Sequence, residues 1–310
     1  MGCSRSPARF PGVDWEQKGL LLPAPLSVPW AASHAALPHA HQLQDGRLRL
    51  FFSSRDEQGR SRIGRASLDL DSAEVEVEDE PILEPGPLGA FDDNGVTTSC
   101  LVADGERQLL YFTGWSLGRT VPFYLYVGCA VSVNGARFER VSPSPILERN
   151  EFDPYLTASP WVLVDEGRWR MWYVSGTGWH LVDGEPRHRY HVKYAESHDG
   201  ISWKRGGVVC IDFRDADEYA ISRPCVVRDG ELYRMWFSSR GNAYRMGYAE
   251  SNDGETWERK DEEAGIEGSG DWDSEMQAYP AVLDHGERRY LLYNGNDYGR
   301  TGIGWAIDSR

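Results

Sequence analysis

Short hydrophobic runs with aromatic residues recur along the chain, and each run ends in small or polar positions. Five such segments share one pattern and lie at 47–55, 107–115, 168–176, 232–240 and 288–296. An aromatic residue stands at the centre of each: Phe52, Phe112, Tyr173, Phe237 and Tyr293. Runs of this length with aromatic and β-branched residues are typical of β-strands. The pattern therefore predicts one strand-filled unit repeated about every 60 residues.

Tight turns separate the strands within each unit. Asp-Gly pairs at 45–46, 104–105 and 229–230 follow a first strand, and pairs at 199–200 and 253–254 follow a third strand. Asp-Gly supplies the positive φ angles of a two-residue hairpin turn. Each unit is therefore predicted to be a four-stranded antiparallel meander. Five of them predict an all-β fold, a single five-bladed β-propeller.

The last unit is too short for a fourth strand, because the chain ends soon after its third. The segment that starts at Trp15 resembles the fourth-strand segments that start at Trp203 and Trp257. We therefore expect an N-terminal strand at about 13–23 to join the last unit, which closes the ring and covers an exposed strand edge. The prediction is one domain over residues 1–310. Its blades are expected at about 31–80, 93–148, 155–212, 219–265 and 275–310.

The composition is that of a globular protein and narrows the range of partners. The chain has 310 residues, with 33 Lys and Arg against 48 Asp and Glu, which gives a formal net charge of −15. An acidic chain without a basic stripe repels phosphate backbones, so neither nucleic acid nor a membrane is an expected partner. No long apolar segment occurs, and the five cysteines form no CxxC pair. We therefore expect a cytoplasmic protein without a disulfide framework, and its oligomeric state stays open.

Carboxylates and other polar groups gather at one rim of the predicted propeller. In a meander the Asp-Gly turns share one rim, so the longer loops lie at the opposite one. Four of the five loops before a first strand carry Asp or Glu, and Arg, Trp or Asn follow several second strands. Trp stacks on sugar C–H surfaces, carboxylates bind hydroxyls, and two neighbouring carboxylates can act as acid and base. The rim is therefore expected to bind a sugar-containing or anionic small molecule.

The candidate residues come from these loops. The candidate catalytic residues are Glu218, Glu275, Asp93 and His34. The candidate substrate-binding residues are Arg55, Arg240, Trp115, Glu151, Tyr155, Trp179, His180, Arg223 and Asn296. Arg55 and Arg240 end matching Ser-Ser-Arg triplets, which favours a carboxylate or phosphate on the ligand, although salt bridges between blades would explain them equally well. No metal site or cofactor is predicted, and a central cation stays open.

The repeat plan and the rim residues resemble the five-bladed propellers of the glycoside hydrolase clan, such as families 32, 43 and 130. The resemblance implies glycosyl hydrolysis or transfer with paired carboxylates. Family 43 enzymes usually carry a Glu acid about two residues before the proline of a later inner strand. The corresponding residues of this chain are all uncharged: Ala36, Thr98, Ala158, Ser222 and Ala278.

Two further functions therefore stay open beside glycosyl hydrolysis or transfer. One is non-hydrolytic acid–base chemistry on a small metabolite, such as cyclisation, elimination or isomerisation, with His34 and a carboxylate moving protons. The other is carbohydrate binding without chemistry. The sequence does not decide among the three.

Overall fold

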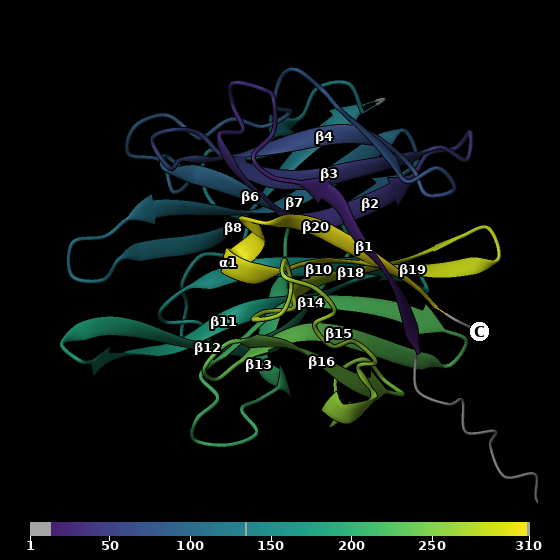
Figure 1. Ribbon diagram of the computed structural model, residues 1–310. Helices are drawn as coiled ribbons and strands as arrows, with labels where there is room; N and C mark the ends of the chain where they lie inside the picture. Colours follow the sequence, from purple (N-terminus) through teal and green to yellow (C-terminus); the bar gives the residue numbers. More distant parts are fainter. Residues whose placement is uncertain (1–13, 134, 309–310) are drawn as a thin grey trace, which may run out of the picture.

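The computed structural model describes residues 14–133 and 135–308, and these residues form β-strands and loops almost throughout (Figure 1). Residues 1–13, 134 and 309–310, which include both ends of the predicted domain, lie outside the described residues. The all-β prediction is confirmed. The described residues also contain one 3-10 turn, η1 (Asp261–Glu263), and one four-residue turn, α1 (Asn296–Gly299). In the described part of the chain, no helix is long and apolar enough to cross a membrane.

The strands form antiparallel groups, numbered here 1 to 5, in which each strand is hydrogen-bonded to the next. Group 1 is β2 (Ser33–Gln42), β3 (Leu48–Arg55), β4 (Ser61–Asp69) and β5 (Glu74–Val77). Group 2 is β6 (Gly95–Asp104), β7 (Arg107–Leu117), β8 (Phe123–Val133) and β9 (Glu139–Arg140). Group 3 is β10 (Thr157–Asp165), β11 (Arg168–Val182), β12 (Glu185–Ser197) and β13 (Lys204–Ile211). Group 4 is β14 (Ala220–Asp229), β15 (Leu232–Arg240), β16 (Tyr244–Ser251) and β17 (Glu258–Arg259).

Group 5 contains strands from both ends of the described chain. Its order is β18 (Ala278–His285), β19 (Arg288–Asn294), β20 (Gly302–Asp308) and β1 (Trp15–Pro23). β1 runs antiparallel to β20, from Trp15 beside Asp308 to Pro23 beside Gly302 (Figure 1). The predicted pairing of an N-terminal strand with the last unit is therefore observed, and it covers the edge of β20.

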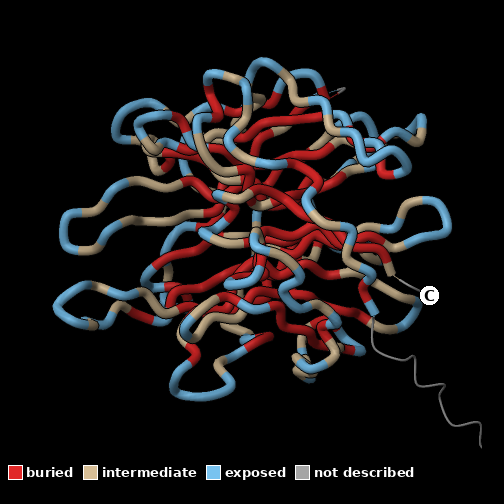
Figure 2. The backbone as a smooth tube through the Cα atoms, in the orientation of Figure 1, coloured by how far each residue is buried: buried red, intermediate tan, exposed pale blue. Residues whose placement is uncertain are grey.

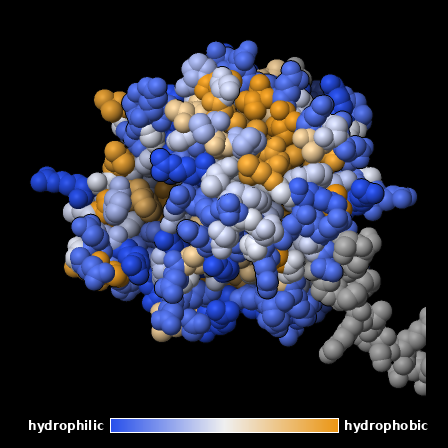
Figure 3. Space-filling model, viewed as in Figure 1, coloured by the Kyte–Doolittle hydropathy of each residue, from blue (hydrophilic) through white to orange (hydrophobic). Residues whose placement is uncertain are grey.

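Aromatic residues fill the space inside and between the groups. The central aromatic residue of each second strand is 0% exposed: Phe52, Phe112, Tyr173, Phe237 and Tyr293. Glycines of the third strands allow close packing, because a Cβ on Gly128 would lie 2.2 Å from the ring of Phe112. Figure 2 shows the result, with buried residues along the strands and exposed ones at the loops. Most of the molecular surface that is visible in Figure 3 is hydrophilic.

The described cysteines also belong to the buried interior. They are free and buried: Cys100, Cys129, Cys210 and Cys225. The backbone N–H of Val162 donates to Cys100 Sγ at 3.3 Å, and that of Val282 donates to Cys225 Sγ at 3.1 Å. The four thiols therefore act as small packing groups, and two of them, Cys100 and Cys225, also accept a hydrogen bond from the neighbouring inner strand.

Hydrogen bonds between a backbone N–H and a side chain join neighbouring groups. We call the first strand of each group its inner strand, and each inner strand has a bulge where its register with the second strand shifts. At four junctions between groups, a backbone N–H at the bulge of one inner strand donates to a side-chain oxygen of the preceding group. The accepting residue directly follows the central aromatic residue on the second strand of that group. The bonds are Thr98 to Ser53 Oγ, Ser159 to Thr113 Oγ1, Tyr279 to Ser238 Oγ and Leu37 to Asn294 Oδ1, at 2.7–2.8 Å.

Ion pairs tie the loop before an inner strand to the outer strand of the same group. These loop ion pairs are Asp92 with Arg140, Asp153 with Arg205 and Glu218 with Arg259, at 2.7–2.8 Å. Asp273 has the same place in group 5, where Gln17 of β1 lies 3.4 Å from its carboxylate. All four carboxylates are 3% exposed or less. The loop ion pairs therefore fix the course of the loops from which the rim is built.

We expect the Asp153→Ala substitution to destabilise the protein strongly. The buried carboxylate of Asp153 accepts hydrogen bonds from Arg205 at 2.8 Å, from the Tyr173 hydroxyl at 2.9 Å and from Ser175 Oγ at 2.7 Å. Without this carboxylate the Arg205 guanidinium loses its counter-charge. We expect this loss to lower the free energy of unfolding, measured in urea, by about 3–5 kcal/mol.

The matched control is Asp45→Ala. Asp45 forms an exposed ion pair with Arg47 at 2.6 Å, and exposed pairs contribute little to stability. We expect no measurable change for this variant. Equal losses of stability for Asp45→Ala and Asp153→Ala would contradict the structural role of the loop ion pairs.

Candidate functional site

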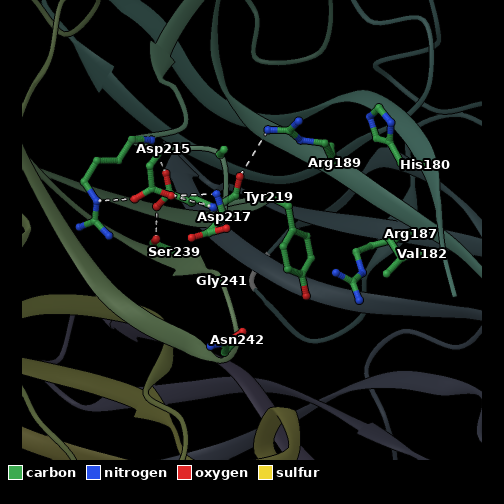
Figure 4. Close-up of a pocket in the computed structure, with 13 residues that line it drawn as sticks. His180, Val182, Arg187, Arg189, Asp215, Asp217, Tyr219, Ser239, Gly241 and Asn242 are labelled. Atoms are coloured by element: carbon green, nitrogen blue, oxygen red, sulfur yellow. Dashed lines mark hydrogen bonds and ion pairs between the residues drawn. The ribbon is translucent and has the colours of Figure 1, made fainter.

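Two cavities lie on the side of the molecule where the second strands end. The loops that lead into the inner strands are on the same side. The axial cavity has a volume of about 260 Å³, and residues from all five groups line it. The rim cavity has a volume of about 680 Å³ and lies between groups 3 and 4 (Figure 4). Of these two, the axial cavity alone is reached from every group.

The axial cavity combines one cation, several hydroxyl groups and aromatic walls. Its polar side chains are Arg55, Thr97, Thr113, Ser159, Ser222 and the two tyrosines, Tyr190 and Tyr279. Trp115 and Phe123 supply further aromatic surface. No Asp or Glu is among the described residues that line this cavity. Ala158 and Ser222, two of the uncharged residues found where family 43 enzymes carry acids, line it directly.

Arg55 at the axial cavity and Arg240, which lies near it but lines neither cavity, have no acidic partner among the described residues. Arg55 lines the cavity, and both Arg55 and Arg240 lower the pKa of Tyr279 in opposition to the larger effect of burial, which raises it. The guanidinium carbon of Arg240 lies 5.3–5.4 Å from the ring centres of Tyr219, Tyr244 and Tyr298. Within the described ranges neither arginine has a carboxylate in ion-pair distance. Salt bridges between groups, which would have explained these two arginines equally well, are therefore not formed by either of them within the described residues.

His34 is held in a state that accepts a proton. It lies at the start of β2 with a φ of 62°, and its Nδ1 is 2.9 Å from Ser33 Oγ. Burial lowers the pKa of His34 to about 4, with Arg55 and Arg300 acting in the same direction and Asp297 opposing them. The imidazole is therefore neutral at neutral pH, so it can accept a proton but not donate one as an acid, and its lowered pKa makes it a weak base.

Glu218 belongs to a loop ion pair and also lines the rim cavity. Arg259 donates to both of its carboxylate oxygens at 2.8 and 2.9 Å, and Ser239 Oγ and the backbone N–H of Arg214 donate as well. Burial alone would raise the pKa of Glu218, but these hydrogen bonds outweigh it and the pKa lies below its ordinary value. A role as proton donor would require the ion pair with Arg259 to break.

The other carboxylates predicted for the site line neither cavity. Asp93 accepts a hydrogen bond from the backbone N–H of Gly89 at 3.0 Å, as a turn-capping residue does. Glu151 is exposed, and so is Glu275, whose backbone N–H donates to Asn296 Oδ1 at 2.9 Å. Their predicted roles stay predictions, and the structure does not bring these carboxylates together.

The remaining predicted residues divide among the two cavities, the interior and the exposed surface. Trp115 lines the axial cavity and His180 the rim cavity. Trp179 packs against Phe123, with ring centres 5.2 Å apart, while Tyr155 is exposed and away from both cavities.

Arg223 lies among the inner strands. Its side chain is 1% exposed and donates to the carbonyl oxygens of Thr98 and Pro38, both at 2.7 Å. Burial lowers the pKa of Arg223 to about 10, so the group still carries its charge at neutral pH. It thus joins group 4 to groups 1 and 2. The described residues contain no cluster of three or more His, Cys, Asp or Glu that could hold a metal ion.

Several residues of the site were not predicted from the sequence. Tyr279 has a φ of 58° at its bulge and corresponds to Leu37, Ser159 and Arg223, each of which precedes the proline of its inner strand. This shared position could have identified Tyr279. Tyr190 lies on β12, and its hydroxyl is 2.6 Å from that of Tyr244. No comparable sequence signal marks that pair.

Comparison with known proteins finds close relatives. No protein-family model matches the chain. Two proteins of Mycobacterium tuberculosis, named "Uncharacterized protein MT1551" (strain CDC 1551 / Oshkosh) and "Uncharacterized protein Rv1502" (strain ATCC 25618 / H37Rv), are each 43% identical to it over 298 residues. The match covers 95% of this chain and 99% of each relative.

Solved structures share the fold. The chain matches a glycosyl hydrolase from Bacteroides ovatus with a TM-score of 0.72 and 15% identity, over 98% of this chain and 95% of that one. A β-1,2-mannobiose phosphorylase from Listeria innocua gives 0.71 and 12% over 96% of each chain. A thermostable family-43 glycoside hydrolase gives 0.64 and 14% over 89% of each. The predicted resemblance to glycoside hydrolase propellers is therefore confirmed for the fold.

We expect the protein to lose stability as the pH falls from about 6.5 to about 4. Burial lowers the pKa of five histidines: His34, His39, His41, His188 and His191. In this pH range the unfolded chain binds protons that the folded protein excludes. Urea unfolding at pH 7, 6 and 5 measures the effect.

His39 offers a direct check of the cause. Its Nε2 accepts a hydrogen bond from the backbone N–H of Leu101 at 3.1 Å, so a proton on Nε2 would remove that bond. We expect His39→Gln to reduce the dependence of stability on pH below 6.5. A free energy of unfolding that does not change between pH 7 and pH 5 would contradict this account.

Proposed function

The chain belongs to the same family as the two mycobacterial proteins, and we propose that its members bind a sugar-containing substrate with an anionic group in the axial cavity and move protons on it without a carboxylate pair. The observation that carries the proposal is the lining of this cavity, where Arg55 stands among hydroxyl groups and aromatic rings and no carboxylate is present among the described residues. A guanidinium without a carboxylate partner suits a phosphate or carboxylate of the ligand.

The aromatic and hydroxyl groups favour a sugar as the rest of the substrate. Trp115 and Tyr279 offer ring surface, and Thr97, Ser159 and Ser222 offer hydroxyl groups. One structure of similar fold is a complex of a phosphorylase with β-1,2-mannobiose. Aromatic walls with a few polar groups are the usual composition of a small-molecule site.

Proton transfer at this site falls to His34. Ser33 is paired with Arg55 across β2 and β3, and Arg55 contributes to the lowered pKa of His34, so the imidazole lies near this guanidinium although His34 is not among the residues that line the cavity. A neutral imidazole accepts a proton from the substrate, and the adjacent guanidinium stabilises the negative charge that develops. This favours elimination, isomerisation or cyclisation.

Glycosyl hydrolysis or transfer with paired carboxylates is the competing function. Among the carboxylates predicted for the site, Glu218 alone lines a cavity, the rim cavity, where Asp215 and Asp217 also lie. Such chemistry needs two carboxyl groups, roughly 5–9.5 Å apart, on either side of the scissile bond. The ion pair with Arg259 keeps Glu218 ionised, so we favour the acid–base reaction without a carboxylate pair.

We also infer that groups 1 to 5 are the five blades of one domain with the predicted boundaries. The pairing of β1 with β20 supports closure by the N-terminal strand, and so does the hydrogen bond from Leu37 in group 1 to Asn294 in group 5. A cytoplasmic location is part of the same proposal, and the four free cysteines support it.

We expect Arg55→Gln to weaken the binding of anionic sugars at least tenfold, because the ligand loses one charged hydrogen-bonding partner. Calorimetric titration with glucose 6-phosphate and with glucuronic acid measures the effect, and glucose itself should bind more weakly than either. The exposed Arg137 supplies the control, Arg137→Gln, which should bind like the unsubstituted protein. Equal binding of neutral and anionic sugars would contradict the role of Arg55.

We expect His34→Asn to bind these sugars but to lose proton transfer, by a factor of about 10²–10⁴. Incubation of the anionic sugars in D₂O, followed by NMR, detects the exchange of a carbon-bound proton. The unsubstituted protein should catalyse exchange or conversion. Release of free sugar that is lost in Glu218→Gln and Glu275→Gln would establish the competing hydrolysis, and binding without any conversion would establish a binding module.

A further inference from the structure

The rim cavity has one basic wall and one acidic wall. Figure 4 shows Arg187 and Arg189 from β12, with His180 from β11, on one side, and Asp215 and Asp217 on the other. With about 680 Å³ it is the larger of the two cavities described above. A substrate that fills the axial cavity alone would leave this space unused.

The guanidinium groups of the basic wall are available to a ligand. The guanidinium carbon of Arg187 lies 5.0 Å from the ring centre of Tyr219, and that of Arg189 lies 4.4 Å from the ring centre of Phe213. Arg189 Nη2 donates to the carbonyl oxygen of Glu218 at 3.4 Å, and its buried Nε has no partner. In the described structure neither arginine has a carboxylate in ion-pair distance. This contrasts with the arginines of the loop ion pairs, which are neutralised by buried acids.

The acidic wall also contains a third arginine, Arg214, whose Nε lies 3.4 Å from Asp215 Oδ2 in an ion pair. Asp215 Oδ1 accepts hydrogen bonds from the backbone N–H groups of Asp217 and Glu218, both at 3.0 Å. Asp217 is exposed and lines the cavity. Its charge raises the energy of any anion bound nearby, so its removal should strengthen anion binding.

Strand β12 contributes residues to both cavities, Arg187 and Arg189 to the rim cavity and Tyr190 to the axial cavity. Tyr219 lies between two cations, with the guanidinium carbons of Arg187 and Arg240 at 5.0 and 5.3 Å from its ring centre. The Arg240 guanidinium also packs on the ring of Tyr244. The Tyr244 hydroxyl is hydrogen-bonded to that of Tyr190, which lines the axial cavity. On β12, His188 lies in the sequence between the two arginines of the basic wall. Its ring stacks on that of Tyr190, with ring centres 4.6 Å apart. One strand thus serves both cavities.

We propose that the rim cavity is a second subsite, in which Arg187 and Arg189 bind a phosphate-type group of the same substrate. The substrate then carries two anionic groups, one at Arg55 in the axial cavity and one at the basic wall. This inference rests on the proposed function for the link between the subsites. The anion site itself stands on the contacts of the rim cavity alone.

The first experiment isolates the rim subsite with inorganic pyrophosphate as the probe. Titration is done in the Arg55→Gln protein at low ionic strength, so that the axial arginine does not contribute. We expect pyrophosphate to bind, Arg187→Gln and Arg189→Gln to weaken it about tenfold each, and Asp217→Asn to tighten it about twofold. Arg137→Gln, added to the same background, should change nothing. Absence of binding, or binding indifferent to Arg187 and Arg189, would overturn the subsite.

The second experiment tests whether one substrate spans both subsites. Fructose 1,6-bisphosphate carries two phosphates, and glucose 6-phosphate carries one. We expect the bisphosphate to bind about tenfold more tightly than the monophosphate to the unsubstituted protein, and Arg187→Gln to abolish the difference. Equal affinities in the unsubstituted protein would overturn the link between the subsites. Because the pyrophosphate titration does not use Arg55, it separates failure of the rim subsite from failure of the proposed function.

Discussion

The hydrogen bond from a bulged inner strand to the side chain of the preceding group is the contact on which the rest of the structure depends. A bulge leaves a backbone N–H outside the ladder, and a buried N–H needs an acceptor. Ser53, Thr113, Ser238 and Asn294 supply it. Leu37, Ser159 and Tyr279 adopt positive φ at their bulges, which costs about 1–3 kcal/mol each, and all three line the axial cavity. The residues that form these junctions between groups are therefore also residues of the site.

The loop ion pairs explain how an acidic protein keeps arginines without acidic partners at its cavities. Three of the four buried carboxylates of the loops form ion pairs with the outer strands of their own groups, as Asp153 does with Arg205, and the fourth, Asp273, accepts a hydrogen bond from Gln17 of β1. A buried carboxylate is tolerated only when it is paired, so these acids are committed to structure. Arg55, Arg187 and Arg189 are then left at the two cavities without acidic partners among the described residues. A net charge of −15 thus coexists with sites suited to anions.

The sequence predicts the fold well because its signals are local. Repeated strands, Asp-Gly turns and the segment at Trp15 suffice for the all-β class and for the pairing of β1 with β20. The site is predicted less well, because the direction of a side chain depends on distant partners. Glu218 and Arg259 are 41 residues apart, and nothing in the sequence shows that they pair. Tyr190 and Tyr244, 54 residues apart, meet only in the folded protein.

The central claim is that the axial cavity holds an anionic sugar through Arg55. A crystal structure of the protein soaked with glucose 6-phosphate tests it most directly. The account predicts electron density for the ligand in the axial cavity, with a phosphate oxygen in hydrogen-bond distance of the Arg55 guanidinium and the sugar ring against Tyr279 or Trp115. Ligand density bound between acidic side chains such as Glu218 and Glu275, with the axial cavity left without sugar, would contradict it.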